Sequence, residues 1–181
     1  DKLQGMTEYR NAWYQGTAVN LKRFKDNDYD LTLLFGPMYH LFGFDDKLKA
    51  LNEAVRITKP GGIVLVAYCM NEYCVLTYAF KQNHIKECLE NGKLSEDFHC
   101  IQEKQDLYDY VRLDDIDKLN EAAGVKRLQI ISADGPADYM RQILNAMDDE
   151  TFNHFIEYHL ATCERPELIG AGAHTLDILR V

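Results

Sequence analysis

Two apolar runs of strand length occur in the first half of the chain. One spans residues 29–35 (YDLTLLF) and ends at Gly36-Pro37, and the other spans residues 63–68 (IVLVAY) and follows Pro60-Gly61-Gly62. Neither run alternates with polar residues, which is typical of strands that are covered on both faces in a parallel sheet. We therefore predict two neighbouring buried strands.

The segment between these runs has the periodicity of a helix. Apolar residues recur at helical spacing over residues 44–58, namely Leu48, Leu51, Ala54, Val55 and Ile57. Asp45 and Asp46 lie at the start and Arg56 lies near the end, which is the charge order that a helix dipole favours. The Pro-Gly-Gly that follows cannot continue a helix and predicts a tight turn. Strand, helix and strand in this order predict a βαβ unit with a right-handed crossover.

The rest of the chain shows further periodic segments and no repeat, low-complexity tract or linker. The pattern predicts helices over residues 72–91, 113–123, 137–147 and 149–163, strands over 128–133 and 174–181, and a polar, flexible loop over 92–105. Gly124 is expected to end the helix that precedes it. We therefore expect a single domain over residues 1–181.

Composition excludes some classes of protein. The chain of 181 residues is 46% hydrophobic, enough for one packed core, and its net charge of -9 argues against binding to the nucleic-acid backbone. The five cysteines form no C-x-x-C pair, and Cys69 and Cys74 with His84 match no common zinc spacing, so we expect reduced thiols and no metal. Without a membrane span of ~20 apolar residues or a signal-peptide pattern, the expected location is the cytoplasm.

Three motifs resemble one known family. Residues 28–40 (DYDLTLLFGPMYH) resemble the fourth strand and following loop of class I S-adenosylmethionine-dependent methyltransferases. Residues 56–66 (RITKPGGIVLV) resemble their helix end, Pro-Gly-Gly turn and fifth strand, and residues 14–21 (YQGTAVNL) resemble the end of their third strand and its cofactor loop. The resemblance implies an α/β Rossmann-like three-layer sandwich. Its mostly parallel sheet has the order 3-2-1-4-5-7-6, and the cofactor lies across the carboxyl ends of the strands.

The resemblance also implies the residues that bind S-adenosylmethionine. Thr17 and Ala18 would lie near the adenine, although the family usually has an acidic residue where this chain has Thr17. A threonine hydroxyl still accepts a hydrogen bond. Phe35 and Gly36 would pass close to the methionine part, where a glycine lets the backbone approach a ligand.

Candidate catalytic and acceptor residues follow the fourth-strand motif. His40 would lie where donor and acceptor meet and is the candidate proton acceptor, the alternative being a histidine that packs beneath the loop and bonds to the backbone. Tyr39 and Tyr68 are candidate contacts to a small-molecule acceptor, or else ordinary packing residues. Residues 69–112 are expected to form a substrate lid.

Arg165 is a further candidate, as a clamp for an anionic acceptor. The alternative is a surface ion pair with Glu164 or Glu167.

The glycine-rich turn that follows the family's first strand has no counterpart here, since no G-x-G precedes Gly61. We therefore expect the first two strands of the family's sheet to be absent from this chain, so that the domain is incomplete at its N-terminal end. Residues 12–15 would then lose their sheet neighbours, and residues 31–35 would become an exposed apolar edge that invites a homodimer.

The expected function is methyl transfer from S-adenosylmethionine to a small molecule. The alternative is a non-catalytic binding or scaffold protein on the same fold. A nucleotide-dependent oxidoreductase is a weaker third hypothesis, because no dinucleotide fingerprint is present.

Overall fold

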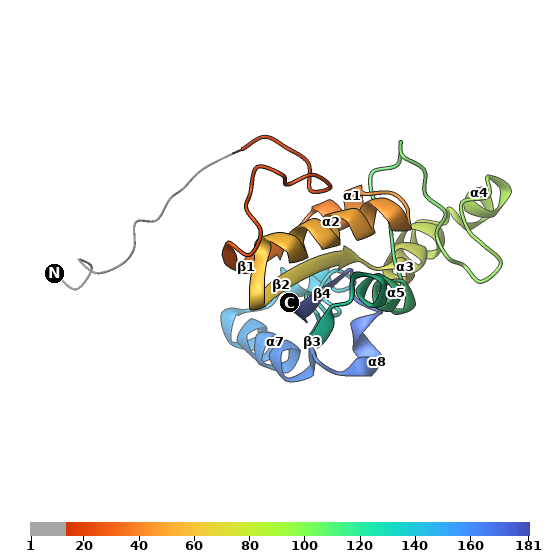
Figure 1. Cartoon of the computed structure of the whole chain (residues 1–181). Coiled ribbons are helices and arrows are strands. Elements are labelled where there is room, and N and C mark those ends of the chain that lie inside the picture. The colour runs from red at the N-terminus through yellow and green to blue at the C-terminus, as the bar shows by residue number, and fades with distance from the viewer. Residues whose placement is uncertain (1–13) are drawn as a thin grey trace.

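A computed structural model of the chain describes residues 14–181, which fold around a four-stranded sheet of order β1-β2-β4-β3 (Figure 1). The strands are β1 (Tyr29–Leu34), β2 (Thr58–Cys69), β3 (Lys126–Ser132) and β4 (His174–Arg180). β1 pairs parallel with β2, and β4 pairs antiparallel with both β2 and β3. Three strands therefore point one way, and β4 alone is reversed.

One expectation about the sheet holds in part, and another is corrected. The mostly parallel sheet is only partly present, because β3 and β4 follow each other in sequence and lie side by side, so the chain returns along the sheet without a crossover. Tyr14 and Gln15 were expected to end a strand, but they belong to no strand. Ala12 and Trp13, also placed in that strand, lie outside the described residues. From residue 14 to β1 the structure contains no strand against which they could pair.

The βαβ prediction is confirmed. β1 leads through the short helix α1 (Pro37–His40) into α2 (Phe44–Ile57), which returns the chain to β2. The apolar positions of α2 that were identified by periodicity lie on its buried face, including Leu51 and Ala54. The helix therefore forms where local sequence and tertiary burial agree.

The Pro-Gly-Gly segment is not a turn before the strand but a distortion within β2. Tyr29 pairs with Thr58, while Leu31, two residues later, pairs with Ile63, so β2 is bulged between these points. At Gly62 a side chain would collide with the neighbouring backbone: a Cβ there would lie 2.9 Å from the Asp30 carbonyl oxygen. Glycine is therefore required by this close approach.

The 69–112 segment begins with α3 (Asn71–Cys74), continues as the π-helical η1 (Val75–Lys81), and is followed by α4 (Ile85–Glu90). The single helix expected over 72–91 is wrong, because the backbone between η1 and α4 turns at Asn83 into the left-handed region (φ 62°).

Buried Asn71 connects α3 to the polar stretch expected to be a loop. Its Nδ2 donates to the Phe98 carbonyl oxygen at 3.1 Å, and its Oδ1 accepts from the Cys100 amide at 2.7 Å. Within the same stretch, Leu94 and Cys100 form an isolated β-bridge. Hydrogen bonds between residues far apart in the sequence thus connect the start of the 69–112 segment to its second half.

The C-terminal elements follow the sequence pattern with one exception. α5 (Leu113–Ala123) ends at Gly124 as predicted, with φ at 66°. α7 (Asp149–Thr162) begins where the Asp148 side chain accepts from the Thr151 amide at 2.8 Å. The helix expected over 137–147 is reduced to the single turn α6 (Arg141–Leu144), and α8 (Pro166–Ile169) precedes β4.

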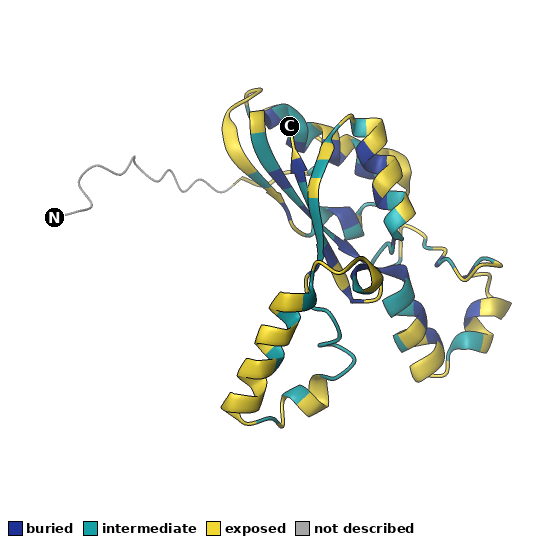
Figure 2. Ribbon diagram, turned by 90° about the horizontal axis from the view of Figure 1, so that it is seen from below, coloured by how far each residue is buried: buried dark blue, intermediate teal, exposed yellow. Residues whose placement is uncertain are grey.

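One face of the sheet is covered and the other is partly open. α2 and α5 pack together over Val64, Val66 and Leu179. On the opposite face of β1, Leu31 and Leu33 are 51% and 55% exposed, which confirms the expected exposed apolar strand within the described residues. Figure 2 shows this face, together with α7, none of whose residues is buried. The second helical layer of a complete three-layer sandwich is therefore not formed over β1 by residues 14–181.

None of the helices in residues 14–181 is both long and apolar enough to cross a membrane.

An ion pair joins the end of β3 to the start of β4 and makes stability depend on pH. His174 Nδ1 lies 2.7 Å from Asp134 Oδ2. The hydrogen bond to Asp134, followed by that to Cys69, raises the pKa of His174 from 6.5 to about 10. Since the folded-state pKa lies above the unfolded one, the pair stabilises the fold fully below pH 6.5, and this contribution is lost as the pH rises towards 10.

We predict that the difference in unfolding free energy between the wild type and Asp134→Asn shrinks as the pH rises through this window. Urea denaturation at a series of pH values measures it. Titration of other groups cancels when the unfolding free energy of Asp134→Asn is subtracted from that of the wild type. A difference in unfolding free energy that stays constant from pH 6.5 to 10 would contradict the prediction.

Candidate functional site

The candidate site lies at the carboxyl end of β1, where Phe35 and Gly36 lead into α1. Gly36 has φ at 115°, a conformation that L-residues with a side chain rarely adopt. A Cβ at this position would lie 3.7 Å from the Tyr39 hydroxyl, and the Phe35 side chain is exposed. The loop therefore presents backbone and one aromatic ring at the end of a parallel strand, where open α/β sheets bind their ligands.

Tyr39, His40 and Tyr108 form an aromatic cluster beside this loop. The ring centroids lie 4.9 Å apart for Tyr39 and His40, 5.7 Å for Tyr39 and Tyr108, and 5.3 Å for His40 and Tyr108. Burial, followed by the charges of Cys69 and Tyr108, raises the pKa of Tyr39, so its hydroxyl is neutral at ordinary pH. The cluster thus joins α1 to the far end of the 69–112 segment.

The hydrogen bond of His40 defines its tautomer. Nδ1 lies 3.0 Å from the Leu107 carbonyl oxygen. A carbonyl can only accept, so Nδ1 carries the proton and the neutral imidazole has its lone pair on Nε2. The backbone bond considered as the alternative for His40 is therefore present, and it leaves the second nitrogen able to accept a proton.

Lys47 and Asp109 hold the cluster in place, and sequence reasoning missed both. Lys47 on α2 is only 4% exposed, and its Nζ donates to Asp109 Oδ2 and, at 2.6 Å, to the Leu41 carbonyl oxygen. Asp109 Oδ2 also accepts from the Gly43 amide at 3.0 Å. A lysine among the polar positions of a helix gives no local signal of burial, since its partner is far away in the sequence.

The other expected cofactor residues lie in the segment before β1. Thr17 and Asn20 close a tight turn, in which the Asn20 amide donates to the Thr17 carbonyl oxygen at 3.2 Å. Thr17 and Ala18 line a cavity of about 370 Å³ formed by residues 14–24. Neither Phe35 nor Gly36 lines that cavity, so residues 14–181 do not bring the two groups of expected cofactor residues into one cavity.

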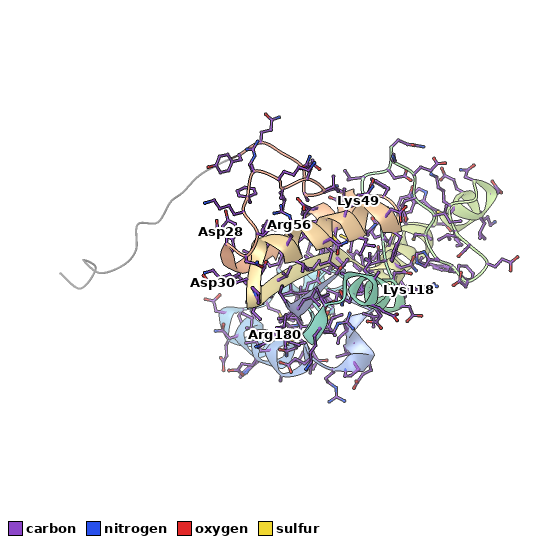
Figure 3. All side chains as sticks on the ribbon, viewed as in Figure 1. Asp28, Asp30, Lys49, Arg56, Lys118 and Arg180 are labelled. Atoms are coloured by element: carbon purple, nitrogen blue, oxygen red, sulfur yellow. The ribbon has the colours of Figure 1, made fainter. Side chains whose placement is uncertain are left out.

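Arg56 fixes the segment that follows this turn. From α2, its guanidinium donates to the Leu21 and Phe24 carbonyl oxygens, each at 3.0 Å, and pairs with Glu53 and Asp26. Figure 3 shows Arg56 on the side of α2 that faces this segment. Hydrogen bonds to Glu53 and then Asp26 raise the pKa of Arg56, which stays charged.

We predict that Arg56→Ala frees the segment over residues 21–26 without unfolding α2. Backbone hydrogen exchange measures this: the amides of Leu21 and Phe24, which donate to Glu53 and to the Leu21 carbonyl oxygen, should exchange at least about tenfold faster, because the guanidinium that holds Glu53 and the Leu21 and Phe24 carbonyl oxygens is lost. Lys49→Ala is the matched control, since Lys49 lies on the same helix and, within residues 14–181, forms an ion pair with Asp46 alone. Equal exchange in the two variants would show that Arg56 does not hold the segment.

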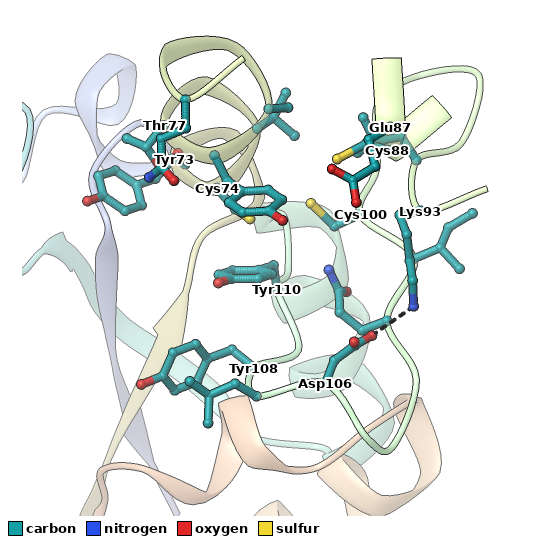
Figure 4. A pocket seen from close by; sticks show the side chains of 18 of the residues that line it. Tyr73, Cys74, Thr77, Glu87, Cys88, Lys93, Cys100, Asp106, Tyr108 and Tyr110 are labelled. Carbon is teal, nitrogen blue, oxygen red and sulfur yellow. Dashed lines mark hydrogen bonds and ion pairs between the residues drawn. The ribbon is translucent and has the colours of Figure 1, made fainter. Parts of the chain in front are cut away.

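A larger cavity of about 650 Å³ lies within the 69–112 segment (Figure 4). Its wall contains four tyrosines, Tyr73, Tyr78, Tyr108 and Tyr110, and three thiols, those of Cys74, Cys88 and Cys100. Tyr108 belongs both to this wall and to the aromatic cluster. The cavity is therefore lined within the 69–112 segment alone, and Tyr108 separates it from Tyr39 and His40, which do not line it. No sequence motif indicated the cavity beyond the richness in tyrosine.

The structure does not place the remaining candidates at this site. Tyr68 is 1% exposed, packs in the main core and lines no described cavity, and its hydroxyl has no hydrogen-bond partner among the described residues. Arg165 pairs with Glu167, Nε to Oε1 at 2.7 Å, which is one of the surface pairs considered as its alternative. Residues 14–181 contain no group of three or more His, Cys, Asp and Glu side chains that could hold a metal ion.

Known proteins share this fold. A family model described as a methyltransferase domain matches residues 2–66. Similar solved structures are S-adenosylmethionine-dependent methyltransferases from Thermotoga maritima (18% identity, TM-score 0.50) and Methanosarcina mazei (9%, 0.52). The order β1-β2-β4-β3 corresponds to strands 4-5-7-6 of the expected sheet. The chain has the fold of the class I S-adenosylmethionine-dependent methyltransferases.

The chain spans less than two thirds of the length of these two structures. Each alignment includes 91% of the residues of this methyltransferase-fold chain. It includes only 61% of the Thermotoga protein and 64% of the Methanosarcina protein. Another methyltransferase, from Archaeoglobus fulgidus, is 11% identical with a TM-score of 0.51, with coverage of 93% of this chain and 66% of that one. A search of curated protein sequences gives no match.

Proposed function

We propose that this methyltransferase-fold protein transfers a methyl group from S-adenosylmethionine to a small molecule. The observation that supports it is the Phe35-Gly36 loop, which ends β1 within the residues matched by the methyltransferase-domain model. Its glycine is in a backbone conformation that side chains disfavour, beside aromatic rings and a histidine with a free nitrogen. This arrangement suits a donor and an acceptor that meet at the end of β1.

Two separate groups of residues fit the two ends of S-adenosylmethionine. Phe35 and Gly36 would contact its methionine part, because a chain without a Cβ at residue 36 can lie against a ligand. Thr17 and Ala18 would contact its adenine. When bound, the cofactor would supply a methyl group attached to a positively charged sulfur. The thioether that remains after methyl transfer is neutral and therefore a good leaving group.

The chain's own residues would align the acceptor and remove its proton. Tyr39 and Tyr108, whose rings contact each other edge to face, would form an apolar wall beside the acceptor. His40 Nε2 would accept the proton of an acceptor hydroxyl or amine, since Nδ1 is held by Leu107. Residues 69–112 would act as a lid, because Leu107 and Tyr108 at the end of this segment contact His40.

Nuclear magnetic resonance of the chain with millimolar S-adenosylhomocysteine tests the proposal. We expect shifts at the amides of residues 16–21 and 35–40, and loss of the shifts at 35–40 in Gly36→Val. The method detects weak binding, which suits a chain in which no G-x-G turn precedes Gly61. Absence of shifts at both groups of amides would refute cofactor binding by these residues.

A non-catalytic binding protein on the same fold is the second candidate. The observation in its favour is Thr17, which stands where the family usually has an acidic residue. Binding of S-adenosylhomocysteine at residues 16–21 and 35–40, without methyl transfer to any of a panel of hydroxyl and amine acceptors, would support this candidate.

We also propose that the open side of β1 pairs with a second copy of the chain. In residues 14–181 β1 has a strand neighbour on one side alone, so its other edge is available for pairing, and Leu31 and Leu33, about half exposed on the open face of β1, would pack against the second copy. Sedimentation velocity tests this: the wild type should sediment as a dimer and Leu33→Lys as a monomer, with Lys126→Ala on β3 as the control. A monomeric wild type would refute the pairing.

A further inference from the structure

We infer that the cavity within the 69–112 segment binds an uncharged, mainly apolar phenol, whose hydroxyl lies at the Tyr108 end of the cavity. This inference rests on the proposed function, because it identifies the class of acceptor for the same site. The cavity has a volume of about 650 Å³, which lies within the usual range for sites that bind small molecules.

Lys93 and Asp106 of the cavity wall pair with each other, and Glu87, the third charged residue of the wall, contacts a histidine outside it. Lys93 Nζ lies 3.2 Å from Asp106 Oδ2 and 3.4 Å from Glu103 Oε2, and the first of these pairs is marked in Figure 4. Glu87 Oε2 lies 3.2 Å from His84 Nδ1 at an exposed position. An anionic ligand would therefore lose its water without gaining an unpaired cation among these groups, and the exposed Glu87 offers a cation only a water-screened contact.

The rest of the wall is apolar or weakly polar. Val75, Ala79, Cys88, Leu94 and Cys100 form a buried cluster behind the cavity. Burial raises the pKa of the Cys88 thiol, which stays neutral. This part of the wall favours a ligand body without charge.

Aromatic rings supply the remaining walls and suit a flat ring. Tyr108 and Tyr110 contact each other edge to face with centroids 6.3 Å apart, and Tyr78 stacks on His84 at 4.5 Å. Burial raises the pKa of Tyr110, so its hydroxyl is neutral at ordinary pH. An aromatic ligand gains edge-to-face or stacked contacts from such walls.

Cys74 offers the alternative to a neutral ligand. Its hydrogen bond with Cys100 lowers the pKa of the Cys74 thiol, and a thiolate there would be an unpaired negative charge that favours a cation. A cationic ligand is therefore included in the test as a competing outcome.

A ligand hydroxyl at the Tyr108 end of the cavity would lie near the proposed proton acceptor His40, which packs against Tyr108 outside the cavity wall. The Tyr108 ring lies 5.3 Å from that of His40, whose Nε2 is free to accept a proton. In the proposed transfer, His40 Nε2 would take the phenolic proton, while the cofactor would supply the methyl group to the phenol oxygen and its sulfur would keep the electron pair of the broken carbon–sulfur bond. A phenol suits proton transfer to His40 better than an alcohol does, because the phenolic proton is more acidic than that of an alcohol.

Three probes with the same ring system test the class of ligand: 2-naphthol, which is neutral at pH 7, 2-naphthoate, an anion, and 2-(aminomethyl)naphthalene, a cation. Titration calorimetry with the 181-residue chain should show 2-naphthol binding at least about tenfold more tightly than either charged probe. Equal binding of all three probes, or tightest binding of the anion or the cation, would overturn the inference.

Variants test the location. Cys88→Phe fills the cavity from α4 and should weaken 2-naphthol binding by about tenfold or more, whereas Leu89→Phe, exposed on the same helix and outside the wall, should leave it unchanged. If Cys88→Phe is not folded by circular dichroism, Tyr108→Ala replaces it with the same expectation. Unchanged binding in the folded cavity variant would overturn the inference.

These measurements contain no cofactor, so they separate the two proposals. Binding of 2-naphthol in this cavity, together with no S-adenosylhomocysteine shifts, would leave the cavity assigned to a neutral phenol and refute the methyl-transfer site. Cofactor shifts without preference for 2-naphthol would retain the cofactor site and refute the acceptor class.

Discussion

Asp177→Ala is expected to lower the free energy of unfolding by about 3 kcal/mol, the lower end of the range for breaking a buried ion pair. Asp177 on β4 is 0% exposed. Its carboxylate accepts from Arg127 Nε at 2.7 Å and Nη2 at 2.9 Å, and from Asn120 Nδ2 at 2.6 Å. The three residues join β3, β4 and α5 beneath the sheet, so the variant loses contacts among three elements at once.

The cost arises mainly from the groups that are left behind. Without Asp177, the guanidinium of Arg127 keeps one carboxylate partner, Asp117, and the buried Asn120 amide loses its acceptor. Unpaired buried donors cost more than the net gain of the bonds that they made. Arg127 is 27% exposed, so water restores part of the loss, which is why the lower end of the range is expected.

Urea denaturation measures this effect, with Tyr68→Phe as the matched control. Tyr68 lies beside Asp177, whose charge adds to burial in raising the pKa of the tyrosine, and its hydroxyl has no partner among the described residues. Removing that hydroxyl should change the stability by no more than about 0.5 kcal/mol, or increase it. A loss below about 1 kcal/mol for Asp177→Ala would mean that the cluster does not act as a buried ion pair.

Gly62→Ala is expected to destabilise the fold by about 1–3 kcal/mol, the usual cost of forcing extra atoms into a filled space. The added Cβ would lie 2.7 Å from Thr58 Cγ2, 2.8 Å from the Lys59 carbonyl oxygen and 2.9 Å from the Asp30 carbonyl oxygen. Two of these atoms belong to the backbone. A change of rotamer therefore cannot remove the clash, and β1 would have to move against β2.

Thermal or urea unfolding of Gly62→Ala against Gly16→Ala checks this prediction. A Cβ at Gly16 would meet no atom within 4 Å, and its φ lies outside the left-handed region, so that substitution should be close to neutral. Equal stability of the two variants would show that the bulge in β2 can relax without cost.

The elements that could be predicted from the sequence are those whose signals are local. α5 and its end at Gly124 follow from apolar periodicity and one glycine, and the unit of β1, α2 and β2 follows from two apolar runs around an amphipathic segment. The Phe35-Gly36 loop with Tyr39 and His40 lies at the end of β1 simply because these residues follow that strand in the chain. Neighbours in sequence remain neighbours in the fold, so this part of the site needed no tertiary information.

The features that the sequence could not reveal depend on residues far apart in the chain. The break at Asn83, the bulge around Gly62 and the burial of Lys47 each depend on what packs against them, and each looks ordinary in its own segment. A bulge can be located only when the register of its partner strand is known.

By itself, the sequence determined the class of fold, the order of its βαβ unit and the candidate loop after β1, because helix and strand periodicities and glycine positions act over short distances. Tertiary structure alone decided that Tyr108 packs against His40, that Asp109 pairs with Lys47, and that the 69–112 segment encloses a cavity. It also placed Tyr68 in the core and Arg165 in a surface ion pair. The reason is that burial and contact between distant residues depend on the packing of the whole chain, which a local pattern does not contain.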